Sequence, residues 1–131
     1  MQSMYAITTT TRFSAAHAIR LYDGSLEPLH GHNWCVEVTV AADELDAIET
    51  VMDFHELERL VERVVTPARN GNLNAIPPFI GADGMLAVNP TAERVAWWIG
   101  EAVIRELPDR VKLMSVRVEE APGCFATYRP R

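Results

Sequence analysis

The sequence lacks an excess of basic residues and has no long apolar run. Twelve Lys and Arg stand against 18 Asp and Glu, for a formal net charge of −6, and no basic stretch is present to neutralise the phosphates of a nucleic acid. No apolar run approaches the roughly 20 residues that span a bilayer. We therefore expect neither nucleic-acid nor membrane partners. Anionic ligands must instead be bound by local arginines or helix N-termini.

The N-terminal segment also lacks the basic end and apolar core of a secretory signal, so a cytoplasmic location is the default expectation. Only two cysteines are present, Cys35 and Cys124, and in such a chain buried free thiols are favoured over a disulfide. The 131 residues allow one domain, covering residues 1–131. They are too few for a (β/α)₈ barrel, which needs roughly 250.

The period of the hydrophobic pattern changes from two to 3.6 and back along the chain. Strands are predicted over residues 5–17, 30–41, 111–120 and 125–129. One helix is expected to begin at Asp53 and a second within Asn89-Pro90-Thr91, because both places carry N-capping residues. Pro67 and Pro108 are expected to end these helices. Residues 66–89, rich in Pro, Gly and Asn, form an irregular stretch of a length that is usually functional or mobile.

This order of elements is typical of an α+β domain in which both helices cover one face of a four-stranded antiparallel sheet. The opposite sheet face then needs a partner. Several copies that assemble into a larger sheet or β-barrel would cover it, so we expect a homo-oligomer.

Three of the four histidines indicate a metal site. His30 and His32 lie at positions i and i+2 of a predicted strand, where side chains point the same way and can converge on one ion. His17, at the end of the first strand, supplies a third imidazole, and three imidazoles suit Zn²⁺ with a fourth position open. The alternative is that these are core histidines bonded to backbone carbonyls. His55, in the first turn of a helix, is expected to be solvated, with no ligand role.

Glu120 continues the apolar face of the strand that contains Val116 and Val118. A carboxylate there is costly unless it is paired, so we expect it to bind a guanidine-like ligand edge. The alternative is that the strand has already ended and Glu120 is solvated.

A second possible metal motif overlaps the histidine pair. Gly24, His30, His32 and Glu37 match the spacing of the first metal motif of the cupins. However, Glu37 has the opposite strand parity to the histidines, and Glu44 occupies the position of the closing glycine. Two strong helices also suit a jelly roll poorly, so the cupin interpretation is the weaker one.

Four segments resemble one family in sequence and in order. They are FSAAH (13–17), HGHN (30–33), NPTAE (89–93) and VEEAPG (118–123). The family is that of 6-pyruvoyl-tetrahydropterin synthase and 6-carboxytetrahydropterin synthase, which has the tunnelling fold. The resemblance covers nearly the whole chain. It implies subunits that assemble as trimers or hexamers around a β-barrel.

The resemblance also implies functional residues. Zinc would be held by His17, His30 and His32, the pterin ring would be anchored by Glu120, and Thr91 would line the pterin pocket. The usual substrate in the family is 7,8-dihydroneopterin triphosphate, from which triphosphate is eliminated, and the pathways implied are queuosine or folate biosynthesis.

The chain departs from the family at its proton-transfer residues. The catalytic cysteine of the family lies four or six residues before the first histidine of HGH, where this chain has Leu26 and Gly24. Cys35 lies on the other side of the motif and does not replace it. The family's Asp-His pair corresponds to Arg69 and Asn70.

Glu27, three residues before His30, resembles the glutamate of a variant branch in which side-chain cleavage leads toward 6-hydroxymethyl-dihydropterin. A carboxylate beside Zn²⁺ can act as a general base, although it could equally be an ordinary loop charge. The leading hypothesis is a zinc-dependent pterin enzyme that uses Glu27 on 7,8-dihydroneopterin triphosphate or a related dihydropterin. The alternatives are a non-catalytic zinc- and pterin-binding protein, and another metal-dependent hydrolase on the same scaffold.

Overall fold

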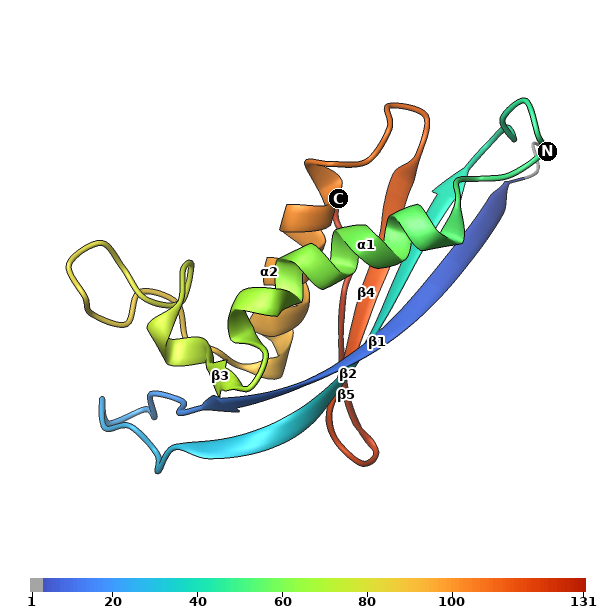
Figure 1. The fold of residues 1–131 in the computed structure, drawn as a ribbon. Coiled ribbons are helices and arrows are strands. Elements are labelled where there is room, and N and C mark those ends of the chain that lie inside the picture. Colours follow the sequence, from blue (N-terminus) through green and yellow to red (C-terminus); the bar gives the residue numbers. More distant parts are fainter. Residues whose placement is uncertain (1–3) are drawn as a thin grey trace.

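The computed structural model describes residues 4–131 and consists of a five-stranded sheet and two α-helices (Figure 1). Residues 1–3, which the expected single domain includes, lie outside the described residues. The elements are β1 (Tyr5–His17), β2 (His30–Ala42), α1 (Phe54–Val65), β3 (Gly71–Asn72), α2 (Ala92–Ile104), β4 (Lys112–Ala121) and β5 (Cys124–Tyr128). No helix in residues 4–131 is both long enough and apolar enough to cross a membrane.

The sheet has the strand order β3-β1-β2-β4-β5, and both helices lie on one of its faces (Figure 1). The predicted α+β class and one-sided helical layer are thus confirmed. The predicted count of four strands is short by one, because β3 pairs in parallel with β1 at Ala15 and Ala16. A strand of two residues is too short to show an alternating pattern, and it lies in the stretch predicted to be irregular.

The core fills the space between the sheet and the helices. Alternate residues of β1, β2 and β4 face the helices, as the period-two pattern predicts. The buried members are Phe13, Trp34, Val36, Val38, Val40, Val116 and Val118 from the sheet, Leu57, Leu60, Val61 and Val65 from α1, and Val95, Ile99 and Val103 from α2. This packing holds the ends of β1 and β2 in register, with His17 opposite His30.

The helix-free face of the sheet is polar. Thr8 and Thr39 bring their hydroxyl oxygens within 2.7 Å of each other, and Arg117 lies 3.8 Å from Glu37. Phe125, which is half exposed and packs against Arg117, adds one large apolar side chain to this face. The outer edge of β5, and the part of β1 that precedes its short pairing with β3, are the features that favour assembly.

Both helices begin at predicted capping residues. The Asp53 carboxylate accepts a hydrogen bond from the His55 amide, and the Thr91 hydroxyl accepts one from the Arg94 amide, so Thr91 rather than Asn89 is the cap. Helix α1 ends at Val65, just before Pro67 as predicted. Helix α2 ends at Ile104. Pro108 predicted a later end, but residues 105–107 already form a turn and a bend.

The two cysteines are free thiols, as predicted. The expectation that they are buried is wrong: Cys35 is partly buried and Cys124 is exposed. Cys35 belongs to the set of β2 residues that alternate with the buried ones, and Cys124 is the first residue of β5, directly after Pro122 and Gly123.

Candidate metal centre

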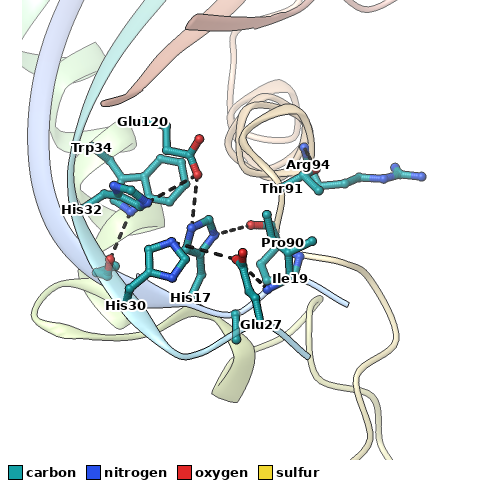
Figure 2. Close-up of polar contacts among 12 residues, drawn as sticks. His17, Ile19, Glu27, His30, His32, Trp34, Pro90, Thr91, Arg94 and Glu120 are labelled. Atoms are coloured by element: carbon teal, nitrogen blue, oxygen red, sulfur yellow. Dashed lines mark hydrogen bonds and ion pairs between the residues drawn. The ribbon is translucent and has the colours of Figure 1, made fainter. Parts of the chain in front are cut away.

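His17, His30 and His32 converge at one end of the sheet (Figure 2). One ligand atom from each of the three side chains lies within 4.8 Å of those of the other two. The register explains this convergence: His17 is paired with His30, while Ala15, two residues earlier, is paired with His32. The three side chains that the sequence singles out are thus brought together.

Backbone carbonyls orient two of the imidazole rings. Nδ1 of His17 lies 2.7 Å from the Pro90 carbonyl oxygen, and Nδ1 of His30 lies 2.9 Å from that of Pro28. Because a carbonyl oxygen only accepts hydrogen bonds, both Nδ1 atoms carry the proton in neutral rings. The Nε2 lone pairs are left free, which is the arrangement of metal-binding histidines.

The environment of His17 is the best test of whether a metal ion fits this site. Its side chain is fully buried, and its Nε2 atom has no hydrogen-bond partner among the described residues. Buried polar atoms nearly always have a partner, and a metal ion would supply one. Burial also lowers the pKa of His32, which outweighs the raising effect of Glu120 and favours the neutral, metal-binding form. The donor set of three imidazoles fits Zn²⁺.

Glu120 lies within β4, one residue before the end of the strand. Its Oε1 atom is 3.1 Å from Nε2 of His17 and 3.5 Å from Nε2 of His32 (Figure 2). The contact with His17 lacks hydrogen-bond geometry, so Nε2 stays unpartnered. The alternative that the strand ends before Glu120 is wrong, and the carboxylate points at the histidines.

Glu27 also faces the cluster. Its Oε1 atom accepts a hydrogen bond of 3.0 Å from the Ile19 amide and lies 3.9 Å from Nε2 of His30 (Figure 2). The side chain is 26% exposed. Glu27 is therefore a fixed carboxylate beside the candidate metal ligands, unlike a freely solvated loop charge.

Two residues that build the site are not predicted from the sequence. Trp34 stands beside the histidines, with its ring centroid 5.1 Å from that of His17 and 5.6 Å from that of His32. Its place on the same face of β2 as His30 and His32 was a visible signal. The Pro90 carbonyl that orients His17 has no sequence signal. Thr91, the predicted pterin contact, follows Pro90 and caps α2.

The positions that correspond to the Asp-His pair have structural roles. Arg69 donates two hydrogen bonds, of 2.9 and 2.7 Å, to the carboxylate oxygens of Glu62, and a third to the Arg12 carbonyl oxygen. Asn70 has a positive φ of 56° and donates its amide to the Ser14 carbonyl oxygen. These hydrogen bonds connect the segment after α1 to β1. Neither side chain can act as a general base.

His55 lies apart from the cluster, with a side chain that is 77% exposed, as predicted. A cavity of about 340 Å³ borders His32, Asn33 and Gly71. A larger one, of about 750 Å³, is lined by Tyr5 and residues of the loop between β2 and α1, and it contains none of the three clustered histidines.

Comparison with known proteins agrees with the fold. Residues 6–131 match the family model described as 6-pyruvoyl tetrahydropterin synthase. A dihydroneopterin monophosphate aldolase from Pyrococcus furiosus is 36% identical over 82% of each chain. A 6-carboxy-5,6,7,8-tetrahydropterin synthase from Bacillus subtilis is 32% identical over 97% of this chain and 86% of the relative.

A solved structure of similar fold is the Caenorhabditis elegans 6-pyruvoyl tetrahydropterin synthase. It superimposes with a TM-score of 0.78 at 22% identity, over 99% of this chain and 98% of that one. The tunnelling fold is confirmed, and the cupin interpretation is wrong.

Proposed function

Because this chain belongs to the 6-pyruvoyl tetrahydropterin synthase family, we propose that it is a zinc-dependent enzyme that acts on the side chain of a dihydropterin. The observation that carries the proposal is the Glu27 carboxylate, fixed 3.9 Å from Nε2 of His30 at the edge of a three-histidine cluster. His17, His30 and His32 would hold the zinc ion. When bound, zinc polarises substrate oxygens and stabilises developing negative charge.

We further propose that the reaction is an aldolase-type cleavage with Glu27 as the base. Glu27 takes the proton of the 2′-hydroxyl, the C1′–C2′ bond breaks, and its electrons pass into the conjugated C6=N5 system of the dihydropterin ring. C2′ leaves as an aldehyde, and C1′ then receives a proton to give 6-hydroxymethyl-7,8-dihydropterin. The relative named as an aldolase supports this choice, and so do Leu26, Arg69 and Asn70, which offer no base at the positions used in the elimination reaction.

The pterin ring would be bound by Glu120, whose carboxylate accepts hydrogen bonds from the 2-amino and N3 edge. The 26% exposure of the side chain leaves it accessible from the solvent side of the cluster. Thr91, next to the carbonyl that orients His17, would line the same pocket.

The test is incubation of the zinc-loaded protein with 7,8-dihydroneopterin monophosphate and, separately, the triphosphate, with products identified by mass. We expect 6-hydroxymethyl-7,8-dihydropterin together with the phosphorylated two-carbon aldehyde. Release of inorganic triphosphate would indicate elimination instead. Release of inorganic phosphate with an intact side chain would indicate a hydrolase. Tight pterin binding without turnover would indicate a binding protein.

We also propose that the chain forms a homo-oligomer, a trimer or a hexamer. The outer edge of β5 and the part of β1 that β3 does not cover support this, since an exposed strand edge readily pairs with another copy. Native mass spectrometry is expected to give a multiple of three, and a monomer at micromolar concentration would contradict it. The cytoplasmic location stays a prediction.

A further inference from the structure

The three residues that follow β1 have an unusual set of hydrogen-bond partners. Successive residues use opposite sides of the chain: Ala18 and Arg20 bond to side chains on one side, and Ile19 bonds to Glu27 on the other. This segment links His17 to the loop that carries Glu27. Its path therefore decides where the proposed base lies relative to the metal ligands.

On the first side, two asparagines bond to the backbone of Ala18 and Arg20. The Asn74 side chain accepts a bond of 2.8 Å from the Ala18 amide and donates one of 2.8 Å to the Ala18 carbonyl oxygen. The Asn89 side chain does the same for Arg20, with bonds of 2.8 and 3.0 Å. A carboxamide suits this task, because it has a donor and an acceptor side by side, like a neighbouring strand.

On the other side, Ile19 and Glu27 are paired reciprocally. The Ile19 amide donates to Glu27 Oε1 at 3.0 Å, and the Glu27 amide donates to the Ile19 carbonyl oxygen at 3.0 Å. The Ile19 amide thus fixes one carboxylate oxygen, and the direction of that amide depends on how Ala18 and Arg20 are held.

We propose that Asn74 and Asn89 are positioning residues that orient the Ile19 amide and, through it, the Glu27 carboxylate. Neither asparagine bonds to Glu27 itself. Both asparagines belong to the long stretch between α1 and α2. The function of that stretch is therefore to place two side-chain amides beside the site. The inference deepens the proposed function and rests on it only where Glu27 is called the base.

The first test does not depend on activity. In the zinc-loaded protein, we expect hydrogen exchange of the Ile19 amide to become at least about tenfold faster in Asn74→Ala and in Asn89→Ala, because local opening sets the exchange rate. Asn33→Ala is the matched control: Asn33 bonds to the Ser14 hydroxyl on the helix-free face, and its loss should leave Ile19 exchange unchanged. Unchanged Ile19 exchange in both Asn74→Ala and Asn89→Ala would overturn the proposal. Asn89→Asp, which keeps the acceptor for the Arg20 amide, should be intermediate and serves if the alanine variant does not fold.

The second test is kinetic. We expect Asn89→Ala to lower kcat about 10- to 100-fold, since small displacements of a catalytic group are costly, while KM and the zinc content stay near the wild-type values. In the Glu27→Gln background the same change should lower kcat no further, because it acts through the lost carboxylate. An equal fall in both backgrounds would show a merely structural role. If no dihydropterin is turned over, the proposed function fails, and hydrogen exchange still decides whether the asparagines hold Ile19.

Discussion

Glu120 Oε1 lies 3.1 Å from Nε2 of His17, the buried nitrogen that has no hydrogen-bond partner among residues 4–131. The carboxylate therefore faces the nitrogen of His17 that is free to bind a metal. Two roles are compatible with this place: an additional metal ligand, or an anchor for the pterin ring. They predict different consequences when the negative charge is removed.

We expect Glu120→Gln to weaken pterin binding by about 1.5–3 kcal/mol, the scale of a hydrogen bond to a charged group, and to leave the zinc content unchanged. Calorimetric titration with a dihydropterin and metal analysis measure the two quantities. Glu119→Gln is the control, because Glu119 is bonded to the Gly123 amide. Loss of zinc in Glu120→Gln would make Glu120 a metal ligand, and unchanged pterin affinity would remove it from the pocket.

The histidine cluster is expected to bind one Zn²⁺ per chain. Three Nε2 donors, with the Nδ1 atoms of two rings held by carbonyl oxygens, would form an open zinc site. The double variant His30→Ala, His32→Ala should lose the metal after dialysis, as measured by elemental analysis. His55→Ala should keep it, since His55 is exposed and lies outside the cluster. Full occupancy in the double variant would place the metal elsewhere.

Glu62 makes stability depend on pH in the acid range. The hydrogen bond from the Thr11 hydroxyl, and then the contact with Arg69, lower the pKa of this carboxyl group below its usual value. A lowered pKa contributes stability that is present above the unfolded-state pKa of about 4.3 and is lost as the pH falls through the folded-state value.

We therefore expect Glu62→Gln to reduce the free energy of unfolding at pH 7 by about 0.5–1 kcal/mol, a modest value because the side chain is 45% exposed. Urea unfolding at pH 7 and pH 3 measures this, and the difference from the wild type should shrink at pH 3. Glu58→Gln, an exposed position of the same helix, should change little at either pH. An equal loss at both pH values would contradict a role of the charge.

The sequence was sufficient for those elements whose signal is local. Alternation over the length of β1 and β2 predicts both strands, and the shared parity of His30 and His32 predicts that they point the same way. The sequence did not predict the two-residue strand β3 or the end of α2 at Ile104. Neither feature changes the hydrophobic pattern from which the elements were predicted.

Within the site, the sequence predicted which histidines converge but not what orients them. The carbonyls of Pro28 and Pro90 and the amides of Asn74 and Asn89 reach the site through the paths of two loops. The path of a loop depends on tertiary packing. A backbone carbonyl is present in every residue, so the sequence does not indicate which one will bond to a histidine. The contact between Glu120 and His17 likewise joins strands that are far apart in the chain.

We expect turnover to depend on Glu27 and on neither cysteine. A positioned general base contributes about 10²–10⁴-fold in rate, so Glu27→Gln should lower kcat by that order, while its side-chain oxygen still accepts the Ile19 amide and zinc binding is kept. Cys35→Ala and Cys124→Ala should keep full activity, because these thiols belong to the strands β2 and β5 and not to the histidine cluster. Steady-state kinetics with 7,8-dihydroneopterin monophosphate, alongside metal analysis of each variant, separates loss of the base from loss of the metal. Full activity of Glu27→Gln would exclude Glu27 as the base. Inactivity of either cysteine variant with normal zinc content would show that a thiol takes part in the reaction.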